Sequence, residues 1–133
     1  MPRVMVIDDD STMVSLLTML LELEGFDVSK APRHDSILEG IRAERPDVVL
    51  MDVFLAGADG MEVLSQLRAS PDLASAVVVM TSGMDLEDRC LAAGANAFLL
   101  KPYTPEQLIS KLKNSLAGDG PSAPSARLER KTS

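Results

Sequence analysis

The sequence predicts an α/β domain in which five helices flank a five-stranded, mostly parallel sheet. Short apolar runs rich in β-branched residues alternate along the chain with segments of helical periodicity. Most of these runs stop at a polar or acidic residue, which is typical of strands buried in a parallel sheet. The length of 133 residues suits one domain of ordinary size.

The first strand–helix–strand segment is marked by its ends. Residues 4–7 are a short β-branched run that stops at an acidic cluster, which predicts a buried strand. Ser11 or Thr12 is placed to cap the following helix, and Gly25 to end it. Residues 26–29 then predict a weaker strand.

The middle of the chain predicts a second helix, a third strand and a third helix. The second helix is expected at about 36–44, because Pro46 stops helical geometry just beyond it. Residues 48–52 are a strand that ends at an aspartate. Residues 53–59, rich in Ala and Gly, are expected to form a loop, and 60–69 the third helix.

The last third repeats the alternation. Strands are predicted at 77–80 and 97–100, with a helix at 85–93 between them. The final helix starts with a strong signal, because Thr104 precedes a proline and Gln107 follows three residues after Thr104. We expect this helix to run to about residue 116.

The domain is expected to cover residues 1–117. Residues 118–133 change in composition to Gly, Pro, Ser and Ala, followed by a basic end, and predict a disordered tail or a linker. The sequence leaves open whether that segment connects to a second domain.

Composition excludes several classes of function. A net charge of −7 and a pI near 4.6 argue against direct nucleic-acid binding, and with one Tyr and no Trp a base-stacking surface is missing. The single cysteine, Cys90, excludes an intramolecular disulfide. No segment has the pattern of a signal peptide or a membrane span, so we expect a cytoplasmic protein without membrane contact.

Five polar residues fall at or just after the ends of separate predicted strands: Asp8, Asp9, Asp52, Thr81 and Lys101. The carboxyl ends of parallel strands lie along one edge of the sheet, where ligands bind in such folds. Polar strand ends are common, but chance explains poorly a set of three carboxylates, one hydroxyl and one amine. We therefore expect these side chains to share a cleft.

The residue types in this cleft indicate phosphoryl chemistry. Three carboxylates repel one another unless a cation joins them, and oxygen ligands that leave room for water suit Mg²⁺. The cation would allow Asp52 to act as a nucleophile toward a phosphoryl group. Lys101 and Thr81 would supply a charge and a hydroxyl for the phosphoryl oxygens. No histidine general base accompanies them, which favours a site that accepts and holds phosphate.

These motifs resemble those of response regulator receiver domains. The sequence Val-Ile-Asp8-Asp9-Asp10 is followed by Asp52 at 43 residues from Asp9, by Thr81-Ser82 at 29 residues from Asp52, and by Lys101-Pro102 at 20 residues from Thr81. The resemblance covers roughly residues 2–117. It implies the flavodoxin-like, doubly wound fold of the chemotaxis regulators, with strand order 2-1-3-4-5.

The resemblance also implies a role for each acidic residue. Asp52 would accept a phosphoryl group from a phosphohistidine of a sensor histidine kinase or a histidine phosphotransfer protein. Asp9 would bind Mg²⁺ directly and Asp8 through water, with the backbone carbonyl of Phe54 as a further ligand. Mn²⁺ could replace Mg²⁺.

By the same resemblance the chain is a signalling switch that promotes its own phosphorylation and dephosphorylation, and not a separate enzyme. Thr81 and Lys101 would contact the phosphoryl oxygens, and Phe98 would turn inward as Thr81 moves. The fourth helix, fifth strand and fifth helix would form a surface for partners or a phosphorylation-dependent dimer, including Arg89, Phe98 and Lys113. The output, whether a protein target or an attached domain, is left open.

Two positions depart from the family pattern. The proline usual four residues after the acceptor is Ala56, which predicts a more mobile loop. Phe54, two residues after the acceptor, is bulky and apolar, and we expect it to shield the phosphoryl group from water.

A phosphatase of the haloacid-dehalogenase type is the alternative. Asp8-Asp9-Asp10-Ser11-Thr12 matches its D-x-D-x-T motif, with Asp8 as nucleophile and Asp10 as acid, and Lys101 could serve as its lysine. This alternative lacks a later acidic pair after a strand and leaves Asp52 without a role.

Overall fold

A computed structural model describes residues 1–30 and 37–118. The strands are β1 (Arg3–Ile7), β2 (Asp27–Lys30), β3 (Val48–Asp52), β4 (Phe54–Leu55), β5 (Ala58–Asp59), β6 (Val77–Ser82) and β7 (Ala97–Leu100), and the helices are α1 (Ser11–Leu23), α2 (Ile37–Glu44), α3 (Gly60–Ala69), α4 (Glu87–Ala92) and α5 (Pro105–Leu116). The expected start of the second helix at residue 36 and the expected disorder after residue 118 lie outside the described residues.

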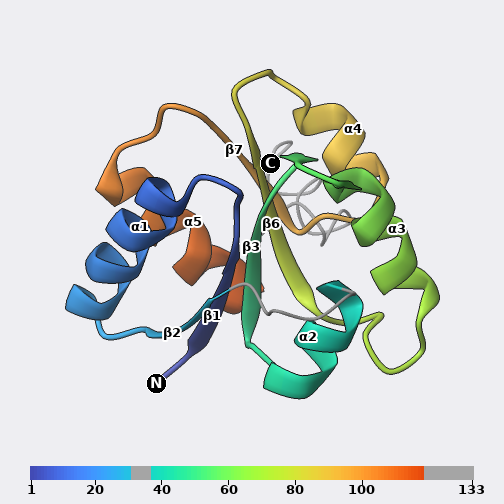
Figure 1. The fold of residues 1–133 in the computed structure, drawn as a ribbon, viewed down its shortest axis with the longest axis horizontal. Coiled ribbons are helices and arrows are strands. Elements are labelled where there is room, and N and C mark those ends of the chain that lie inside the picture. The colour runs from blue at the N-terminus through green and yellow to red at the C-terminus, as the bar shows by residue number, and fades with distance from the viewer. Residues whose placement is uncertain (31–36, 119–133) are drawn as a thin grey trace, which may run out of the picture.

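The main sheet has five parallel strands in the order β2-β1-β3-β6-β7 (Figure 1). Since β6 and β7 are the fourth and fifth strands of this sheet along the chain, the predicted order 2-1-3-4-5 is confirmed. The order reverses between β1 and β3, and the acidic residues after β1 and at the end of β3 lie beside that reversal, where ligands bind in open α/β sheets.

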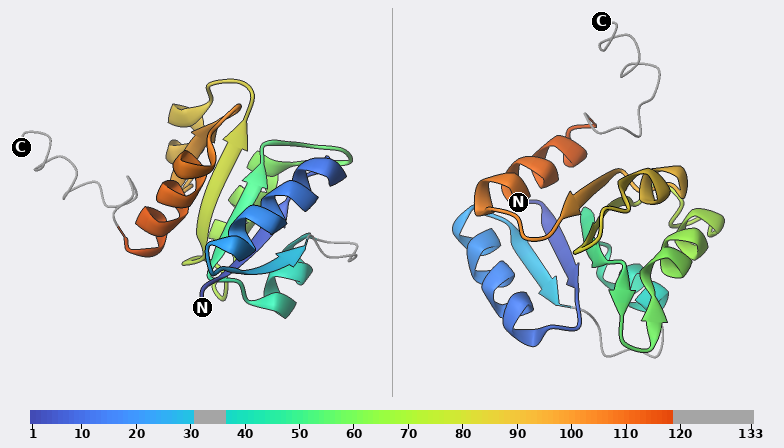
Figure 2. Two further views of the ribbon diagram at one scale, coloured as in Figure 1. Left: turned by 90° about the vertical axis from the view of Figure 1, so that its left-hand side faces the viewer. Right: turned by 90° about the horizontal axis from the view of Figure 1, so that it is seen from above.

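Helices cover both faces of the sheet, with α1 and α5 on one side and α2, α3 and α4 on the other (Figures 1 and 2). Successive residues of a strand face opposite layers. Met5 and Ile7 of β1 accordingly pack in the layer under α2 and α3, whereas Val4 and Val6 pack in the layer under α1 and α5. Two apolar cores therefore fix the sheet from both sides and hold its carboxyl edge in place.

Helix ends agree with the sequence at α5 and differ at α1. The capping box of α5 is confirmed, because Thr104 and Gln107 exchange hydrogen bonds between side chain and backbone. The predicted cap of α1, Ser11 or Thr12, is wrong: Asp10 is the cap, and its carboxylate accepts from the amides of Thr12 and Met13. Aspartate is as good a cap as serine, so the capping rule alone could not choose between neighbours.

The segment expected to be a loop, residues 53–59, contains a two-stranded antiparallel hairpin. Phe54 pairs with Asp59 and Leu55 with Ala58, which leaves a two-residue turn closed by Gly57 at φ +75°. Two-residue turns of this kind need a positive φ, which glycine adopts without steric cost. Each strand has only two residues, so no alternation of apolar and polar positions could mark them in the sequence.

The fourth helix is shorter than the predicted 85–93. It covers Glu87–Ala92, and Leu86 precedes it without a side-chain cap. Among the described residues, no helix is both long and apolar enough to cross a membrane.

Candidate functional site

Four strands of the main sheet carry polar side chains to one edge. β1 ends next to Asp8, β3 ends at Asp52, β6 carries Thr81 near its end, and β7 ends next to Lys101. Asp52 and Thr81 are direct partners in the β3–β6 register. The predicted convergence on one edge of the sheet is therefore present in the structure, and it follows from parallel pairing alone.

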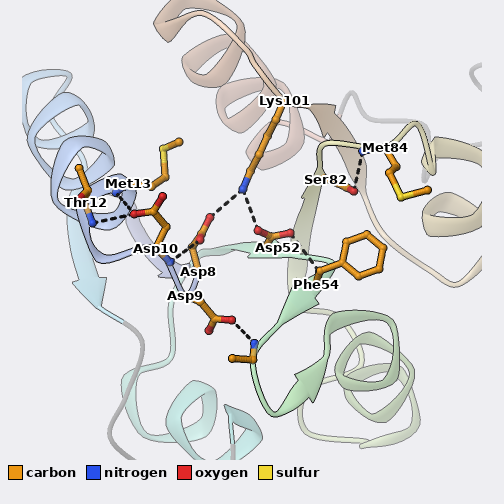
Figure 3. Close-up of polar contacts among 11 residues, drawn as sticks. Asp8, Asp9, Asp10, Thr12, Met13, Asp52, Phe54, Ser82, Met84 and Lys101 are labelled. Atoms are coloured by element: carbon orange, nitrogen blue, oxygen red, sulfur yellow. Dashed lines mark hydrogen bonds and ion pairs between the residues drawn. The ribbon is translucent and has the colours of Figure 1, made fainter.

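Lys101 joins two largely buried carboxylates of this edge, Asp8 and Asp52 (Figure 3). Its Nζ lies 2.8 Å from Asp52 Oδ2 and 3.1 Å from Asp8 Oδ2. The side chains of Asp8 and Asp52 are only 8% and 14% exposed, so water screens their charges weakly. One ammonium group thus bridges two carboxylates and offsets part of their mutual repulsion.

The pKa of Lys101 is raised above its usual value. Burial acts to lower the pKa, but the hydrogen bonds and charges of Asp52 and Asp8 outweigh it. The backbone amide of Lys101 also donates to the carbonyl of Ser82 at 2.8 Å, which fixes the start of the side chain beside the end of β6. Lys101 is therefore a charged cation whose backbone is fixed by Ser82 and whose ammonium is fixed by Asp8 and Asp52.

Asp9 does not join the other two carboxylates. Its carboxylate accepts a hydrogen bond from the backbone amide of Ala56, in the turn of the β4–β5 hairpin (Figure 3). Asp10 faces α1 as its cap, and its amide donates to Asp8 Oδ1 at 3.0 Å. The expectation that Asp9 would lie in one cluster with Asp8 and Asp52 is not met in this arrangement.

The described residues contain no set of three or more acidic, histidine or cysteine side chains arranged to hold a metal ion. The donor chemistry nevertheless fits a hard cation, because Asp8 and Asp52 already direct one oxygen each at a shared positive group, the ammonium of Lys101. Asp9 stands next to Asp8 in the chain, and a turn of its side chain away from Ala56 would add a third carboxylate.

Phe54 lies at the mouth of the site. Its backbone amide donates to Asp52 Oδ1 at 3.1 Å, so both oxygens of that carboxylate have a donor. The ring is 59% exposed, and so is the side chain of Met84, on the loop after β6. Figure 3 places both apolar side chains on the same side of Asp52, opposite Asp9.

Thr81 and Phe98 are both buried, at 2% and 5% exposure. Phe98 already lies in the apolar layer under α3 and α4. It also lines a surface cavity of about 460 Å³ together with Leu100 and Lys111. Lys113, expected on this surface, lies elsewhere: its Nζ is 3.9 Å from Glu24 of the α1 C-terminus.

Gly60 is a part of the site that the sequence analysis missed. A Cβ at this position would collide with the backbone oxygen of Asp52 and lie 2.9 Å from Val53 Cα. Its amide donates to the carbonyl of Val53 at 2.8 Å. The Asp59-Gly60 pair at the start of α3 was visible in the sequence, but nothing there showed that the backbone after Asp52 packs on it.

Residues 4–113 match the family model for the response regulator receiver domain. The chain belongs to this family. It is therefore a receiver domain of two-component signalling, and receiver domains generally use Mg²⁺ for phosphorylation. The match gives no support to the phosphatase alternative with Asp8 as nucleophile.

Curated relatives of this receiver domain are named as a DNA-binding response regulator and a transcriptional regulatory protein. The chain is 34% identical to the DNA-binding response regulator MtrA of Mycobacterium tuberculosis over 116 residues, covering 86% of the chain and 50% of the relative. It is 35% identical to the transcriptional regulatory protein PrrA of Mycobacterium leprae over 127 residues, covering 94% of the chain and 54% of the relative. The chain spans about half the length of the curated relatives it matches.

Solved receiver domains have the same fold. The BeF₃-activated N-terminal receiver domain of RstA from Klebsiella pneumoniae is 30% identical, with a TM-score of 0.77 over 86% of this chain and 97% of that one. A CheY-like receiver domain protein from Methanospirillum hungatei is 27% identical, with a TM-score of 0.79 over 90% and 96%.

One expectation about partners is wrong. A net charge of −7 led us to expect no direct nucleic-acid partner, whereas relatives of this receiver domain are named as DNA-binding response regulators. The charge argument applied only to the 133 residues at hand. It carried no information on the remaining half of such proteins.

Proposed function

We propose that Asp52 is the phosphoacceptor of this receiver domain, with residues 1–117 as the receiver unit. The observation that carries the proposal is the setting of its carboxylate: at the carboxyl end of β3, 14% exposed, with Lys101 on one oxygen and the amide of Phe54 on the other. No other carboxylate among the described residues has both an ammonium partner at 2.8 Å and this place at the centre of the sheet edge.

In the proposed reaction, an oxygen of Asp52 attacks the phosphorus of a phosphohistidine on a sensor kinase or a phosphotransfer protein. The O–P bond forms as the P–N bond breaks, and the imidazole leaves with its electron pair and takes up a proton. Lys101, held at 2.8 Å from Asp52, is close enough to follow the negative charge onto a phosphoryl oxygen. The hydroxyl of Thr81, the register partner of Asp52, would donate to another.

A divalent cation belongs to this proposal. Mg²⁺, or Mn²⁺ in its place, would be held by Asp8, Asp9, Asp52 and the backbone carbonyl of Phe54. When bound it would neutralise charge on the incoming phosphoryl oxygens. The paired arrangement of Asp8 and Asp52 supports this assignment, and Asp9 would have to leave the amide of Ala56 to take part.

Phosphorylation would then change the packing near β6 and β7. Thr81 and Phe98 occupy adjacent strands, where Phe98 pairs in register with Met80, the residue before Thr81. Movement of Thr81 toward the phosphoryl group would alter the space available to the Phe98 ring, a shift between two packed states. Autophosphorylation from small phosphodonors and autodephosphorylation belong to the same proposal.

We further propose that this switch controls a DNA-binding output. The support is the naming of MtrA and PrrA as a DNA-binding and a transcriptional regulator, together with identities of 34% and 35%. The site of action would be the cytoplasm, in keeping with response regulators.

Intact mass spectrometry after incubation with phosphoramidate, with and without Mg²⁺, tests the proposal. The wild-type chain is expected to gain one phosphoryl group only with Mg²⁺, and Asp52→Asn to gain none. Asp88→Asn, which removes an exposed carboxylate on α4, is the matched control and should behave as wild type. Equal phosphorylation of Asp52→Asn and wild type would overturn the assignment.

A further inference from the structure

The carboxylates of Asp8 and Asp9 are neighbours in the chain but have different partners. Asp8 is 8% exposed and paired with Lys101. Asp9 is exposed, and its carboxylate accepts from the backbone amide of Ala56, 47 residues away. This hydrogen bond ties the end of β1 to the β4–β5 hairpin on the far side of the acidic site (Figure 3).

The backbone amide of Ala56, which donates to Asp9, takes no part in the strand pairing of the hairpin. The pairs Phe54–Asp59 and Leu55–Ala58 leave Ala56 and Gly57 as the turn. Gly57 has φ +75°, and Arg45 is the only non-glycine residue with positive φ among those the structure describes. A turn with negative φ first and positive φ second is the type that favours proline at its first position. Proline is therefore compatible with the first position of this turn, and Ala56→Pro removes the N–H that Asp9 accepts from.

We propose that the Ala56 amide competes with a divalent cation for the carboxylate of Asp9. Without a cation, the amide holds Asp9 away from Asp8 and Asp52. A cation bound at the site takes Asp9 from Ala56 and releases the turn of the hairpin. The inference rests on the proposed role of Asp9 as a metal ligand.

Two consequences follow from the position of the hairpin. The apparent affinity of the site for Mg²⁺ is lower than its intrinsic affinity by the free energy of the Asp9–Ala56 hydrogen bond, since that bond must break before Asp9 can bind the cation. Binding of the cation would also affect β4 and β5, because their turn is released. β4 carries Phe54, which lies beside Asp52, and β5 carries Asp59, which caps α3. Ala56 is thus a positioning residue that acts through Asp9.

The test is Mg²⁺ titration by calorimetry of the wild-type chain, Ala56→Pro and Ala56→Ser. Proline removes the backbone N–H of residue 56, whereas serine keeps this backbone N–H and adds only a hydroxyl to the alanine side chain. We expect Ala56→Pro to bind Mg²⁺ roughly fivefold more tightly, the value of one exposed hydrogen bond near 1 kcal/mol. Ala56→Ser should stay within about a factor of two of wild type.

A second readout needs no variant. In ¹⁵N-labelled wild-type protein, the Ala56 amide should exchange with solvent faster once Mg²⁺ is added, because its acceptor has left. Equal Mg²⁺ affinity in wild type and Ala56→Pro, with unchanged Ala56 exchange, would overturn the inference and leave the proposed function intact. Absence of Mg²⁺ binding to the wild-type chain would overturn both.

Discussion

Lys101 is the single residue that most determines the charge balance of the site. Its ammonium lies within 3.1 Å of two carboxylates that are 8% and 14% exposed. Removing one partner from a partly buried ion pair leaves the other charges uncompensated, which costs more than the pair itself contributes. The lysine was visible in the sequence as the residue after an apolar strand. That it bridges Asp8 and Asp52 was not, because side-chain pairing depends on the register of three strands.

Replacing Lys101 by methionine is expected to lower the free energy of unfolding by about 1–3 kcal/mol, as Asp8 and Asp52 then face each other without a cation. Urea unfolding at neutral pH measures the loss. Lys113→Met, which removes an exposed partner 3.9 Å from Glu24, is the control and should change stability by less than about 0.5 kcal/mol. An equal effect of the two substitutions would contradict the account of Lys101.

Phe54 gives a second prediction at the residue scale. Its ring stands beside Asp52, exposed at the mouth of the site, where it would limit the approach of water to a phosphoryl group. Phe54→Asn should therefore lose phosphate severalfold faster than wild type in a time course of intact mass after removal of the donor. The backbone hydrogen bond to Asp52 survives the substitution, so phosphorylation itself should persist. An unchanged lifetime would refute the shielding role.

At the scale of elements, the alternation of strands and helices was predictable because four of the five main-sheet strands contain an apolar run, β2 being the exception, and most helices carry recognisable ends. The capping box at Thr104 is confirmed to the residue. The hairpin of β4 and β5 was not predictable, since four paired residues leave no periodic pattern. The cap of α1 was predicted as Ser11 or Thr12, and the structure places Asp10 there instead.

Gly60, the first residue of α3, packs closely on the backbone that follows Asp52. A Cβ there would lie 2.9 Å from the Val53 Cα and the Val53 carbonyl oxygen. Gly60→Ala is therefore expected to push α3 away from the end of β3 and to lower stability by about 1–3 kcal/mol. Urea unfolding measures the cost, with Gly83→Ala as control, because a Cβ at Gly83 meets nothing within 4 Å. Equal stability of the two variants would show that α3 does not rest on this backbone contact.

At the scale of the whole molecule, one aromatic side chain reports on folding through its ionisation. Burial, followed by the negative charges of Asp8 and Asp52, raises the pKa of Tyr103 against the opposing effect of Lys101. Because the folded state keeps the phenol proton at a pH where the unfolded chain loses it, this contribution to stability is complete below about pH 10 and is lost as pH rises through the folded pKa. Lys101, with its raised pKa, acts in the same direction.

The chain has one Tyr and no Trp, so ultraviolet absorbance of the phenolate follows Tyr103 alone. The midpoint of its titration is expected at higher pH in buffer than in concentrated urea, and the free energy of unfolding should fall over that interval. Coincident midpoints would mean that the packing of Tyr103 against α1 and α5 does not shield its hydroxyl.

The sequence predicted the fold of the whole molecule better than it predicted the output that the domain controls. Five strands, their order and the edge that carries Asp8, Asp52, Thr81 and Lys101 follow from pattern and resemblance. The link to DNA-binding regulators does not, because nothing in an acidic 133-residue receiver domain records what its relatives carry in their other half.

The most direct test of the central claim is to locate the phosphoryl group within the chain. After Mg²⁺-dependent phosphorylation, reduction of the acyl phosphate with borohydride converts the modified aspartate to homoserine, and tandem mass spectrometry of peptides finds its position. We predict homoserine at Asp52 and at no other aspartate. Homoserine at Asp8, or at Asp9 with Asp52 unchanged, would contradict the account.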